Sequence, residues 1–431
     1  MPDPRTDRPL SIGLFTDTYE PQINGVVTSV TGLASALREM GHQVTIVAPR
    51  HPNQSLDPNV IRLRSTTYFP EPGQRMSLPP SPRKLLALRA RRFDIIHTHG
   101  AFTLPVIGLS VARSFGLPIV HTYHTRMRDY VHYYPWYPPV AWLTNQARWY
   151  MTERASRRLR SGLDRSSIVI AGRFDTWFAN RCFEVIAPAE PIAAELREMG
   201  VRRPVLVIPN GIDLASLTAP QPDPFPALGV REGPRLLTAG RLAKEKSFDV
   251  LLRHFQQIHR ARPDATLILL GDGPERANLE ALAGELGIRP GVVFAGYADP
   301  KSMGAHYQHA DLFVFTSLSE TQGLVALEAA ACGLPIVARA EMGITKCVLD
   351  GVTGFLVPPD DGEQFVARTL QLLSDPALRD NFSQSGIEWA GLEGSHRRMA
   401  ERILGSYRRA IRGFTGWPDQ GPIYPELDLP R

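Results

Sequence analysis

The segment SETQGLVALEAAACGLP, residues 319–335, carries the residue types of this sequence that are best suited to chemistry. A buried strand is predicted to end at Ser317 and a helix to begin near Gly323. The backbone N–H groups of Gln322, Gly323 and Leu324 would then lie at a helix N-terminus, where the first N–H groups lack partners within the helix. Because the helix dipole adds partial positive charge there, this N-terminus predicts an anion site that suits a phosphate.

Two glutamates, Glu320 and Glu328, flank this predicted anion site. Glu320 precedes it, whereas Glu328 lies more than one turn into a helix that is otherwise apolar. Burial of a carboxylate is costly without a partner, and the hydroxyl groups of a sugar would supply one. A buried Arg or His is the alternative partner. We favour the functional interpretation because unpaired buried acids are rare.

A cationic loop, GRLAKEK at 240–246, lies between a predicted strand and a predicted helix. Arg241 and Lys246 could there neutralise a diphosphate, since Arg forks two oxygens and Lys acts as a point charge. In isolation these residues would more simply be solvated cations, and it is the neighbouring anion site that favours the diphosphate. The glycines of GDG, 271–273, would let a nucleotide approach the backbone, although a plain turn is equally compatible with them.

The first half of the chain holds a second set of candidates. Gly25 lies at a strand-to-helix turn, where dinucleotide-binding folds meet phosphate, but the sequence lacks the GxGxxG motif of NAD enzymes. HTYHT, 121–125, ends a predicted strand, and its histidines could hydrogen-bond a reacting sugar or an acceptor. The sequence contains neither HExxH nor a strand-ending DxD motif, so we expect no metal cofactor.

Strands and helices are predicted to alternate through both halves, which is the pattern of a parallel sheet with helices on its faces. Strands are expected at 11–15, 43–49, 94–99, 118–124, 183–189, 205–211, 235–240, 266–273, 292–297, 311–317, 335–339 and 354–359. We expect a first domain at 1–217, a proline-rich linker at 218–234, a second domain at 235–395, and a terminal helix and tail at 396–431 that pack back on the first domain. The predicted fold class is therefore α/β, with two Rossmann-like doubly wound domains that face each other across a cleft.

The composition is compatible with two globular domains in a reducing compartment. The chain has 431 residues, of which 43% are hydrophobic and 21% charged, so both domains can bury a core. Three cysteines do not indicate a disulfide framework. No apolar run reaches the roughly 20 residues that a membrane helix needs, and no signal peptide is predicted. We therefore expect a cytoplasmic protein.

Basic residues gather in the first half of a chain whose formal net charge is +5. Arg83, Lys84, Arg89, Arg91 and Arg92 fall within ten residues without an acid among them. Such a cluster can meet nucleic acid, anionic lipid or only water. The basic runs belong to no recognisable module that reads nucleic acid, so we expect no nucleic-acid partner.

An ordered set of motifs resembles the retaining glycosyltransferase family 4. The set comprises IPNGID, GRLAKEK, LGDGPE and ADLFVFTS, followed by Glu320 and Glu328 with seven residues between them. The resemblance covers nearly the whole chain, 10–412, and implies the GT-B fold, retention of anomeric configuration and a nucleotide sugar as co-substrate, bound by the second domain. It implies catalytic roles for His124, Arg241, Lys246 and Glu320. The donor-binding residues that it implies are Gly25, Asn210, Gly240, Gly271, Asp272, Gly296, Tyr297, Gln322, Gly323, Leu324 and Glu328.

A narrower resemblance concerns the acceptor. GLFTDTYEPQINGVVTSV and HTYHTRMRDYVHYY look like the subgroup that glycosylates diacylglycerol on the inner membrane face. It implies hexose transfer from UDP-glucose or UDP-galactose to a membrane lipid by an enzyme peripheral to an anionic membrane. Arg is drawn to anionic lipid, and Tyr and Trp prefer the interface, although a wet arginine face and an aromatic core are the alternative. The implied acceptor or membrane residues are Asp17, Tyr19, Arg89, Arg91, Arg92, Tyr130 and Trp136.

Other activities stay compatible with these residues, because the chain departs from that subgroup between 144 and 180. The nearest alternative is a mannosyl- or hexosyltransferase that acts on phosphatidylinositol or on a lipid-linked or soluble saccharide. A sugar-nucleotide epimerase shares the two-domain shape, and a degenerate transferase would only bind its ligand. The complete set of Arg241, Lys246, Glu320 and Glu328 argues against the degenerate form. No obligate protein partner is indicated.

Overall fold

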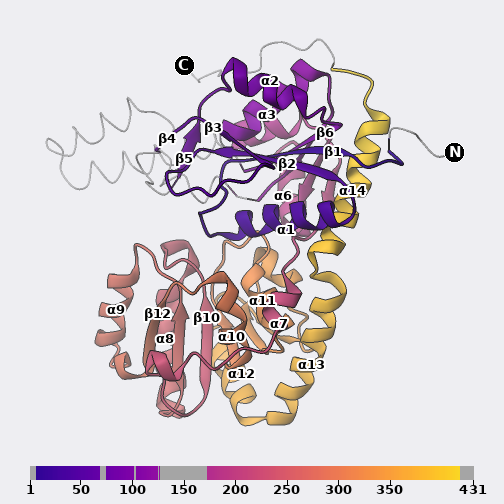
Figure 1. The fold of residues 1–431 in the computed structure, drawn as a ribbon. Coiled ribbons are helices and arrows are strands. Elements are labelled where there is room, and N and C mark those ends of the chain that lie inside the picture. Colours follow the sequence, from indigo (N-terminus) through magenta and orange to yellow (C-terminus); the bar gives the residue numbers. More distant parts are fainter. Residues whose placement is uncertain (1–5, 68–73, 101–102, 125, 127–171, 418–431) are drawn as a thin grey trace, which may run out of the picture. The chain divides into compact units, whose positions relative to one another are not determined.

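A computed structural model describes residues 6–67, 74–100, 103–124, 126 and 172–417 of the chain. The chain divides into two compact units. The first comprises Met1–Ile208 with Ala400–Arg431, and the second comprises Pro209–Met399. Each unit is built around its own parallel sheet, coloured indigo to magenta in the first unit and mainly magenta to orange in the second (Figure 1).

The sheet of the first unit has the order β3-β2-β1-β6-β7-β8-β9, and its strand pairs are all parallel. Its strands are β1 (Ser11–Thr16), β2 (Gln43–Pro49), β3 (Val60–Leu63), β6 (Ile95–His99), β7 (Ile119–Thr122), β8 (Glu184–Ala187) and β9 (Val205–Val207). A short hairpin, β4 (Ser65–Thr67) and β5 (Arg75–Ser77), lies outside this sheet. The strand order reverses between β1 and β6, which is the position at which doubly wound sheets bind ligands.

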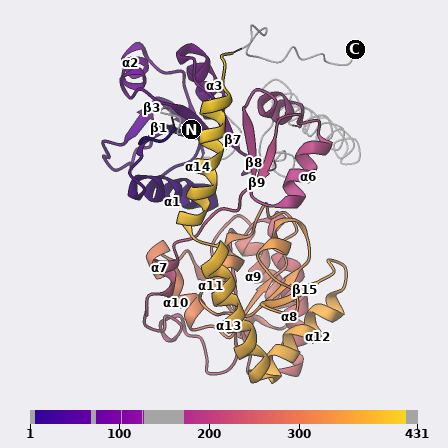
Figure 2. The same ribbon diagram turned by 90° about the vertical axis from the view of Figure 1, so that its right-hand side faces the viewer.

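Helices cover both faces of this sheet. They are α1 (Gly25–Glu39), α2 (Pro82–Ala90), α3 (Thr103–Phe115), α6 (Glu190–Glu198) and most of α14 (His396–Gly413). The neighbouring strand residues His97 and Thr98 contact Tyr407 of α14 and Gly108 of α3, respectively. Because successive side chains point to opposite faces of a strand, α14 and α3 cover opposite faces. Figure 2 shows α14, in yellow, running alongside β7 and β8.

The second unit has a six-stranded parallel sheet of order β12-β11-β10-β13-β14-β15. Its strands are β10 (Arg235–Ala239), β11 (Thr266–Leu270), β12 (Val292–Gly296), β13 (Leu312–Phe315), β14 (Ile336–Arg339) and β15 (Gly354–Val357). Its helices are α7 (Leu214–Thr218), α8 (Phe248–Ala261), α9 (Arg276–Glu285), α10 (Met303–Gln308), α11 (Leu324–Ala331), α12 (Gly362–Ser374) and α13 (Pro376–Glu393). The order again reverses, here between β10 and β13.

Two hydrophobic clusters sandwich this second sheet. Leu267 and Leu269 of β11 pack with α8, α9 and α12 on one face. Ile268 and Leu270 pack with α7, α10 and α11 on the other. Strands buried on both faces read as continuous apolar runs, which explains why TLILL was recognisable as a strand. The prediction of two Rossmann-like α/β domains is confirmed.

The change from one unit to the other falls at Ile208, ten residues before the predicted linker begins. The proline-rich segment 218–234 belongs to the second unit. Phe225 is fully buried there among residues of α7, α10 and β10, and Asp223 pairs with Arg235 at 2.8 Å. The apolar side chain of Phe225 anchors this segment in the core of the second unit. The high proline content of the segment had instead suggested a linker.

Candidate active site

The N-terminus of α11 is held in place by glycines. Gly323, which precedes the helix, has φ of +87°, and a Cβ atom there would approach Ile344 to 2.9 Å. The N–H group of Gly343 donates to the carbonyl oxygen of Glu320 at 2.9 Å, and a Cβ at Gly343 would meet Thr321 O at 2.2 Å. The loop before α11 is therefore packed backbone to backbone. The predicted helix start is confirmed to within one residue.

Lys246 and Glu320 form an ion pair beside this helix N-terminus. Their Nζ and Oε1 atoms are 2.5 Å apart, and both side chains are largely buried. The hydroxyl of Ser319 donates to the carbonyl oxygen of Glu245 at 3.2 Å, which ties the two loops together. Arg241 lies half-buried at the end of β10. A cation and a hydroxyl acceptor thus lie side by side, an arrangement that suits a substrate carrying both phosphate and sugar hydroxyls.

Glu328 has found a partner that sequence reasoning did not predict. The hydroxyl of Tyr307, on α10, donates to its Oε2 at 2.8 Å. Burial raises the pKa of the Glu328 carboxyl to about 7, and the Tyr307 hydrogen bond opposes that rise. The partner expected from the sequence alternative was Arg or His, but it is a neutral phenol. A neutral donor leaves the carboxylate charge uncompensated, so the site can accept further hydroxyl donors.

Gln322 and Asn210 hold each other through three hydrogen bonds. Gln322 Oε1 accepts from Asn210 N at 2.7 Å and from Asn210 Nδ2 at 2.8 Å, and Gln322 Nε2 donates to Asn210 O at 3.0 Å. Both side chains are buried. Each was expected to bind the donor, Gln322 through its backbone. The side-chain role seen here is to fix the Asn210 loop to the N-terminus of α11.

Three glycines at the carboxyl ends of neighbouring strands form a close backbone cluster. Gly271 has φ of +138°, donates to Gly296 O at 2.8 Å, and would place a Cβ within 2.0 Å of Gly240 O. Only glycine fits that approach. Tyr297 is 67% exposed, and its hydroxyl donates to the carbonyl oxygen of Asp272 at 3.1 Å. The structure thus brings together all five of the residues proposed at this edge.

In the first unit, Gly25 is the exposed first residue of α1. Asn24 caps this helix, and its Oδ1 accepts from the N–H groups of Val26 and Val27, each at 3.0 Å. Side-chain capping fixes the direction of the helix axis and leaves the backbone of Gly25 accessible. A 15-residue helix with no acid in its first turn presents partial positive charge at this point.

Asp17, expected near the acceptor, is buried and helps to cap α3. Its Oδ1 accepts from Leu104 N at 2.8 Å and from Thr103 Oγ1 at 3.3 Å. Gly100 has φ of +97°, and a Cβ atom there would approach Asp17 Oδ2 to 2.8 Å. The two hydrogen bonds hold the start of α3 beside the end of β1. A role toward the acceptor stays a prediction.

His124 follows β7 and belongs to a buried cluster of histidines. Its Nε2 lies 2.9 Å from Nδ1 of His99, the last residue of β6. His97, two residues earlier, bonds to Tyr407 and Thr122, each at 2.7 Å. Burial lowers the pKa of His124 to about 3 and that of His99 well below its usual range, so both imidazoles are neutral. Sequence reasoning missed His99, although the alternation in IIHTH places His97 and His99 on one face.

Three of the other proposed acceptor and membrane residues are aromatic. Tyr19 is buried, with the Arg62 guanidinium 5.1 Å from its ring centroid. Tyr130 and Trp136 lie outside the described residues. The roles proposed for these residues toward the acceptor or a membrane stay predictions.

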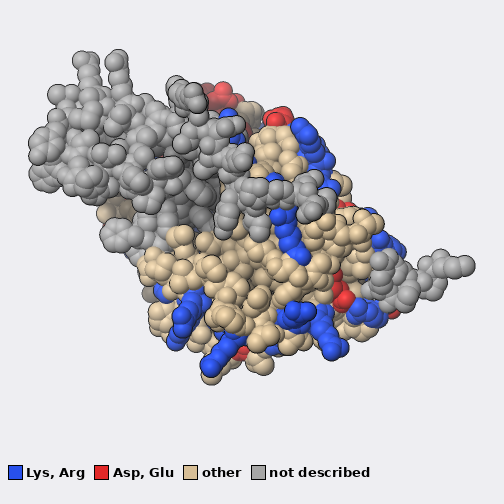
Figure 3. Space-filling view, turned by 90° about the horizontal axis from the view of Figure 1, so that it is seen from above, with Lys and Arg blue, Asp and Glu red and all other residues tan. Residues whose placement is uncertain are grey.

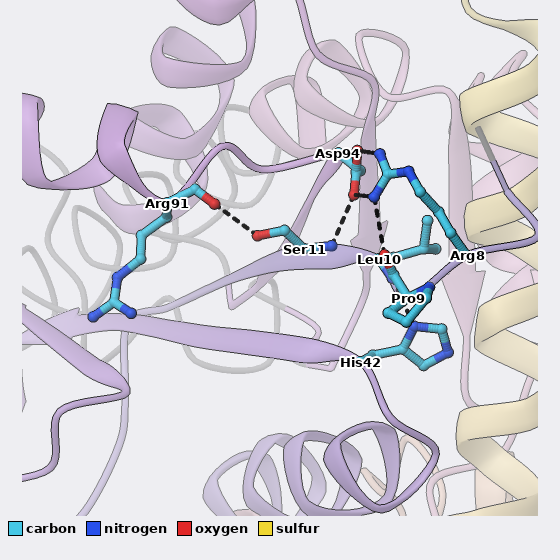
Figure 4. Close-up of polar contacts among 7 residues, drawn as sticks. All are labelled: Arg8, Pro9, Leu10, Ser11, His42, Arg91 and Asp94. Atoms are coloured by element: carbon cyan, nitrogen blue, oxygen red, sulfur yellow. Dashed lines mark hydrogen bonds and ion pairs between the residues drawn. The ribbon is translucent and has the colours of Figure 1, made fainter. Parts of the chain in front are cut away.

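The basic cluster lies on and after α2. Arg89 is exposed on the helix. The Arg91 guanidinium donates to Pro58 O at 2.7 Å. The carbonyl oxygen of Arg91 accepts from Ser11 Oγ at 2.9 Å (Figure 4). Arg92 has φ of +50°, which is uncommon for a residue with a side chain. Arg91 therefore also attaches the end of α2 to the first strand of the sheet, whereas Arg89 is a surface charge.

The described residues contain neither a cluster of metal-ligating side chains nor a helix that could span a membrane. In residues 6–417, leaving aside the parts not described, three or more His, Cys, Asp or Glu side chains nowhere come together to hold a metal ion. Within the same part of the chain, each helix is too short or too polar to cross a membrane.

The chain has two Rossmann-like units, and the strand ends of the second unit carry a helix N-terminus, a lysine–glutamate pair and a glycine cluster. This combination defines the class of the protein as a sugar-nucleotide-dependent transferase of the GT-B fold. Residues 23–216 match the family described as Glycosyltransferase Family 4, and residues 224–389 match Glycosyl transferases group 1. A solved structure of Anabaena Alr3699/HepE in complex with UDP has a TM-score of 0.68 to this chain, at 19% identity, over 92% of this chain and 99% of that one.

Two curated relatives span most of the chain. It is 31% identical to the alpha-monoglucosyldiacylglycerol synthase of Streptococcus pneumoniae (strain ATCC BAA-255 / R6), over 92% of this chain and 86% of that protein. It is 28% identical to the alpha-monoglucosyldiacylglycerol synthase of Acholeplasma laidlawii, over 87% of this chain and 91% of that protein. The chain therefore belongs to glycosyltransferase family 4, and it is a hexosyltransferase.

Proposed function

We propose that the protein transfers a hexose from a nucleotide sugar, UDP-glucose or UDP-galactose, to a membrane lipid such as diacylglycerol, with retention of configuration and without a metal ion. The observation that carries the donor part is the Lys246–Glu320 pair beside the N-terminus of α11. The cation and the helix dipole would bind the diphosphate, and Glu320 would accept from sugar hydroxyls. Glu328 would accept from the ribose.

The proposed chemistry is a front-side displacement at the anomeric carbon. The bond from C1 to the β-phosphate oxygen breaks, and a bond from C1 to the acceptor oxygen forms on the same face. The acceptor hydroxyl proton passes to an oxygen of the departing nucleoside diphosphate. Lys246 and Arg241 would stabilise the charge that develops on that diphosphate, a term that is worth about 100- to 1,000-fold in rate for a single well-placed donor.

An exposed helix of the first unit, α2, supports the proposal of a lipid acceptor. Leu88 is the one buried residue of α2, so nearly the whole helix faces solvent. Exposed leucines on and just before this helix are Leu78, Leu85 and Leu86, at 46%, 39% and 68%. Basic residues exposed on it are Arg83, Lys84 and Arg89. A helix that lies on a membrane typically buries leucines in the interface, while its cations contact the anionic headgroups.

The other side chains of this face are compatible with that surface. Figure 3, seen from above, shows Lys and Arg side chains spaced over a face that is otherwise mostly tan, with few acids in view. The two relatives from Streptococcus pneumoniae and Acholeplasma laidlawii are named as synthases of a glucosyldiacylglycerol, the kind of product that this proposal expects. We therefore place the enzyme on the inner face of the cell membrane, as a peripheral protein.

The test of the reaction is transfer of radiolabelled sugar from a panel of UDP- and GDP-sugars into diacylglycerol vesicles, with and without anionic lipid. Label in the lipid phase from UDP-glucose or UDP-galactose is the expected result. Release of nucleotide without labelled lipid would refute the acceptor and direct the search to phosphatidylinositol and to lipid-linked or soluble saccharides. Product analysis by NMR of the anomeric proton tests retention.

The test of the surface is vesicle flotation of a variant that carries Arg83→Gln, Lys84→Gln and Arg89→Gln. Loss of three charges, each worth about 1 kcal/mol near an anionic surface, should weaken partitioning by about 100-fold. The matched control replaces Arg202, Arg253 and Arg260, which are also exposed, by Gln. Equal binding of both variants to the vesicles would show that α2 is an ordinary solvent-exposed helix and not a membrane-binding one.

A further inference from the structure

A pocket of about 290 Å³ lies at the amino ends of β1, β2 and β3 in the first unit. Its lining includes Ser11 and Gln43, which begin β1 and β2, and Asn59, which directly precedes β3. The candidate residues Gly25 and His124 lie past the opposite, carboxyl ends of β1 and β7. The six residues of β1 span about 20 Å, so the pocket is separate from the candidate transfer site.

Two guanidinium groups line this pocket, whereas no lining residue in the described part of the chain is acidic. Arg38, in the last turn of α1, donates from Nη2 to Val44 O at 3.0 Å. Arg91, which caps the C-terminus of α2, donates from Nη2 to Pro58 O at 2.7 Å. A guanidinium has five N–H donors, so one bond to a backbone carbonyl holds it in place and leaves others for a ligand. A carbonyl also leaves the positive charge uncompensated.

The acids that follow these arginines in the sequence have donors of their own. Asp94 accepts from both terminal nitrogens of Arg8, at 3.1 Å and 2.5 Å. Figure 4 shows Arg8 facing this carboxylate, with the guanidinium of Arg91 turned away from it. Glu39 accepts from the hydroxyl of Ser35 at 3.2 Å. The two cations of the pocket are therefore suited to an anion from outside the chain.

Uncharged polar groups complete the lining of the pocket. Thr45 is 5% exposed, whereas Gln43 and Asn59 are exposed, so the pocket is accessible from solvent. The backbone of Asn59 is fixed, because its N–H donates to Asp57 Oδ1 at 2.7 Å and its carbonyl oxygen accepts from Ile46 N at 2.9 Å. Guanidinium groups bind phosphate oxygens in pairs, and amide and hydroxyl groups bind alcohols.

We infer that this pocket is a second ligand site, which binds a small phosphate ester that carries hydroxyl groups. Arg38 and Arg91 would bind the phosphate, and Thr45 and Asn59 would bind the hydroxyls. The volume is close to the lower end of the range for small-molecule sites, about 300–1,000 Å³, and suits a glycerol phosphate better than a nucleotide sugar. The ester could be free in solution or the headgroup of a phospholipid, since both present the same chemistry.

Two measurements on the full chain distinguish these sources. Calorimetric titration with sn-glycerol 3-phosphate tests the free ester. Flotation with phosphatidylcholine vesicles, with and without phosphatidylglycerol, tests the headgroup. Asn59→Asp keeps the shape of the side chain and adds a negative charge, while Arg38→Gln removes a positive one. Each should weaken binding about 10- to 100-fold in the measurement that supplies the ligand, the worth of one hydrogen bond to a charged group.

Three control variants should bind as the wild type does. Asn53→Asp adds the same charge at an exposed position outside the pocket, and Arg202→Gln removes an exposed charge. Lys246→Met alters the proposed donor site. Since Arg38 also supports the backbone of β2, melting temperatures are compared, and Asn59→Asp decides the outcome if Arg38→Gln unfolds.

Three results would overturn the inference. The first is a wild type that neither binds the free ester nor floats better with phosphatidylglycerol. The second is an equal loss of binding in Asn53→Asp and Asn59→Asp, which would indicate a general effect of charge. The third is binding that Lys246→Met abolishes and Asn59→Asp leaves intact, because the ester would then occupy the proposed donor site.

Discussion

The substitution Tyr307→Phe removes a single hydroxyl group from the proposed ribose site. That hydroxyl donates to Glu328 Oε2 at 2.8 Å. The Tyr307 ring is buried in the second core, 6.0 Å from the centroid of Phe313, and phenylalanine would fill the same space. The fold should therefore persist, and the change acts on the carboxylate alone.

The magnitude follows from the pKa of Glu328, which burial raises to about 7 against the effect of the Tyr307 hydrogen bond. A hydrogen bond to a charged group contributes about 1.5–3 kcal/mol, which corresponds to about one to two pKa units. At pH 7 the ionised fraction would fall from about a half to about a tenth or a hundredth. If the ionised carboxylate binds the ribose, KM for the nucleotide sugar rises about 5- to 50-fold at pH 7 and recovers as the pH rises.

The assay is KM for the nucleotide sugar from initial rates between pH 6 and pH 9. The matched control is Tyr407→Phe, which also removes a buried hydroxyl, but one bonded to the neutral His97 at 2.7 Å. Only Tyr307→Phe should move the pH profile. Superimposable profiles for wild type and Tyr307→Phe would refute the reasoning, since Glu328 would then not act as an ionised ribose acceptor.

The same carboxyl has a consequence for stability. Its pKa is raised in the folded state from an ordinary value of 4.5 to about 7, so folding favours the protonated form. Its contribution to the free energy of unfolding is present below pH 4.5 and is lost as the pH rises through 7. Tyr307→Phe raises the folded pKa further and extends that loss to higher pH, which melting curves between pH 5 and pH 9 would show.

Three further predictions concern the donor site and its support. Lys246→Met and Glu320→Gln should each lower turnover by about 100- to 1,000-fold without unfolding the protein. The control Arg253→Met, at an exposed cation of α8, should leave turnover unchanged. Near-normal turnover of Lys246→Met or of Glu320→Gln would refute the proposed donor site. A chelator should leave turnover unchanged, and a loss that added Mg²⁺ or Mn²⁺ restores would refute metal independence. Gln322→Ala removes three hydrogen bonds to Asn210 and should destabilise the second unit by about 3 kcal/mol, seen as a lower calorimetric melting temperature; an unchanged melting temperature would contradict that support.

Much of the fold was predictable because buried parallel strands read as apolar runs. TLILL and LFVF are continuous apolar segments, and the structure has them as β11 and β13. The predicted positions of Glu320 and of the α11 N-terminus depend only on where a strand ends and a helix begins, so local pattern was sufficient. Residues 218–234 show the limit of such patterns, because the burial of Phe225 depends on partners that are far away in the chain.

By itself, the sequence determined the α/β class, the two Rossmann-like sheets and the family, and it nominated the side chains of the candidate donor site. Only the tertiary structure decided how those side chains are paired. Tyr307 forms a hydrogen bond with Glu328, and Gln322 forms hydrogen bonds with Asn210, which lies 112 residues away in the sequence. His99 forms a hydrogen bond with His124, which follows the neighbouring strand. The physical reason is that periodicity reports burial along one element, whereas a hydrogen bond joins atoms of different elements and is set by how their faces pack.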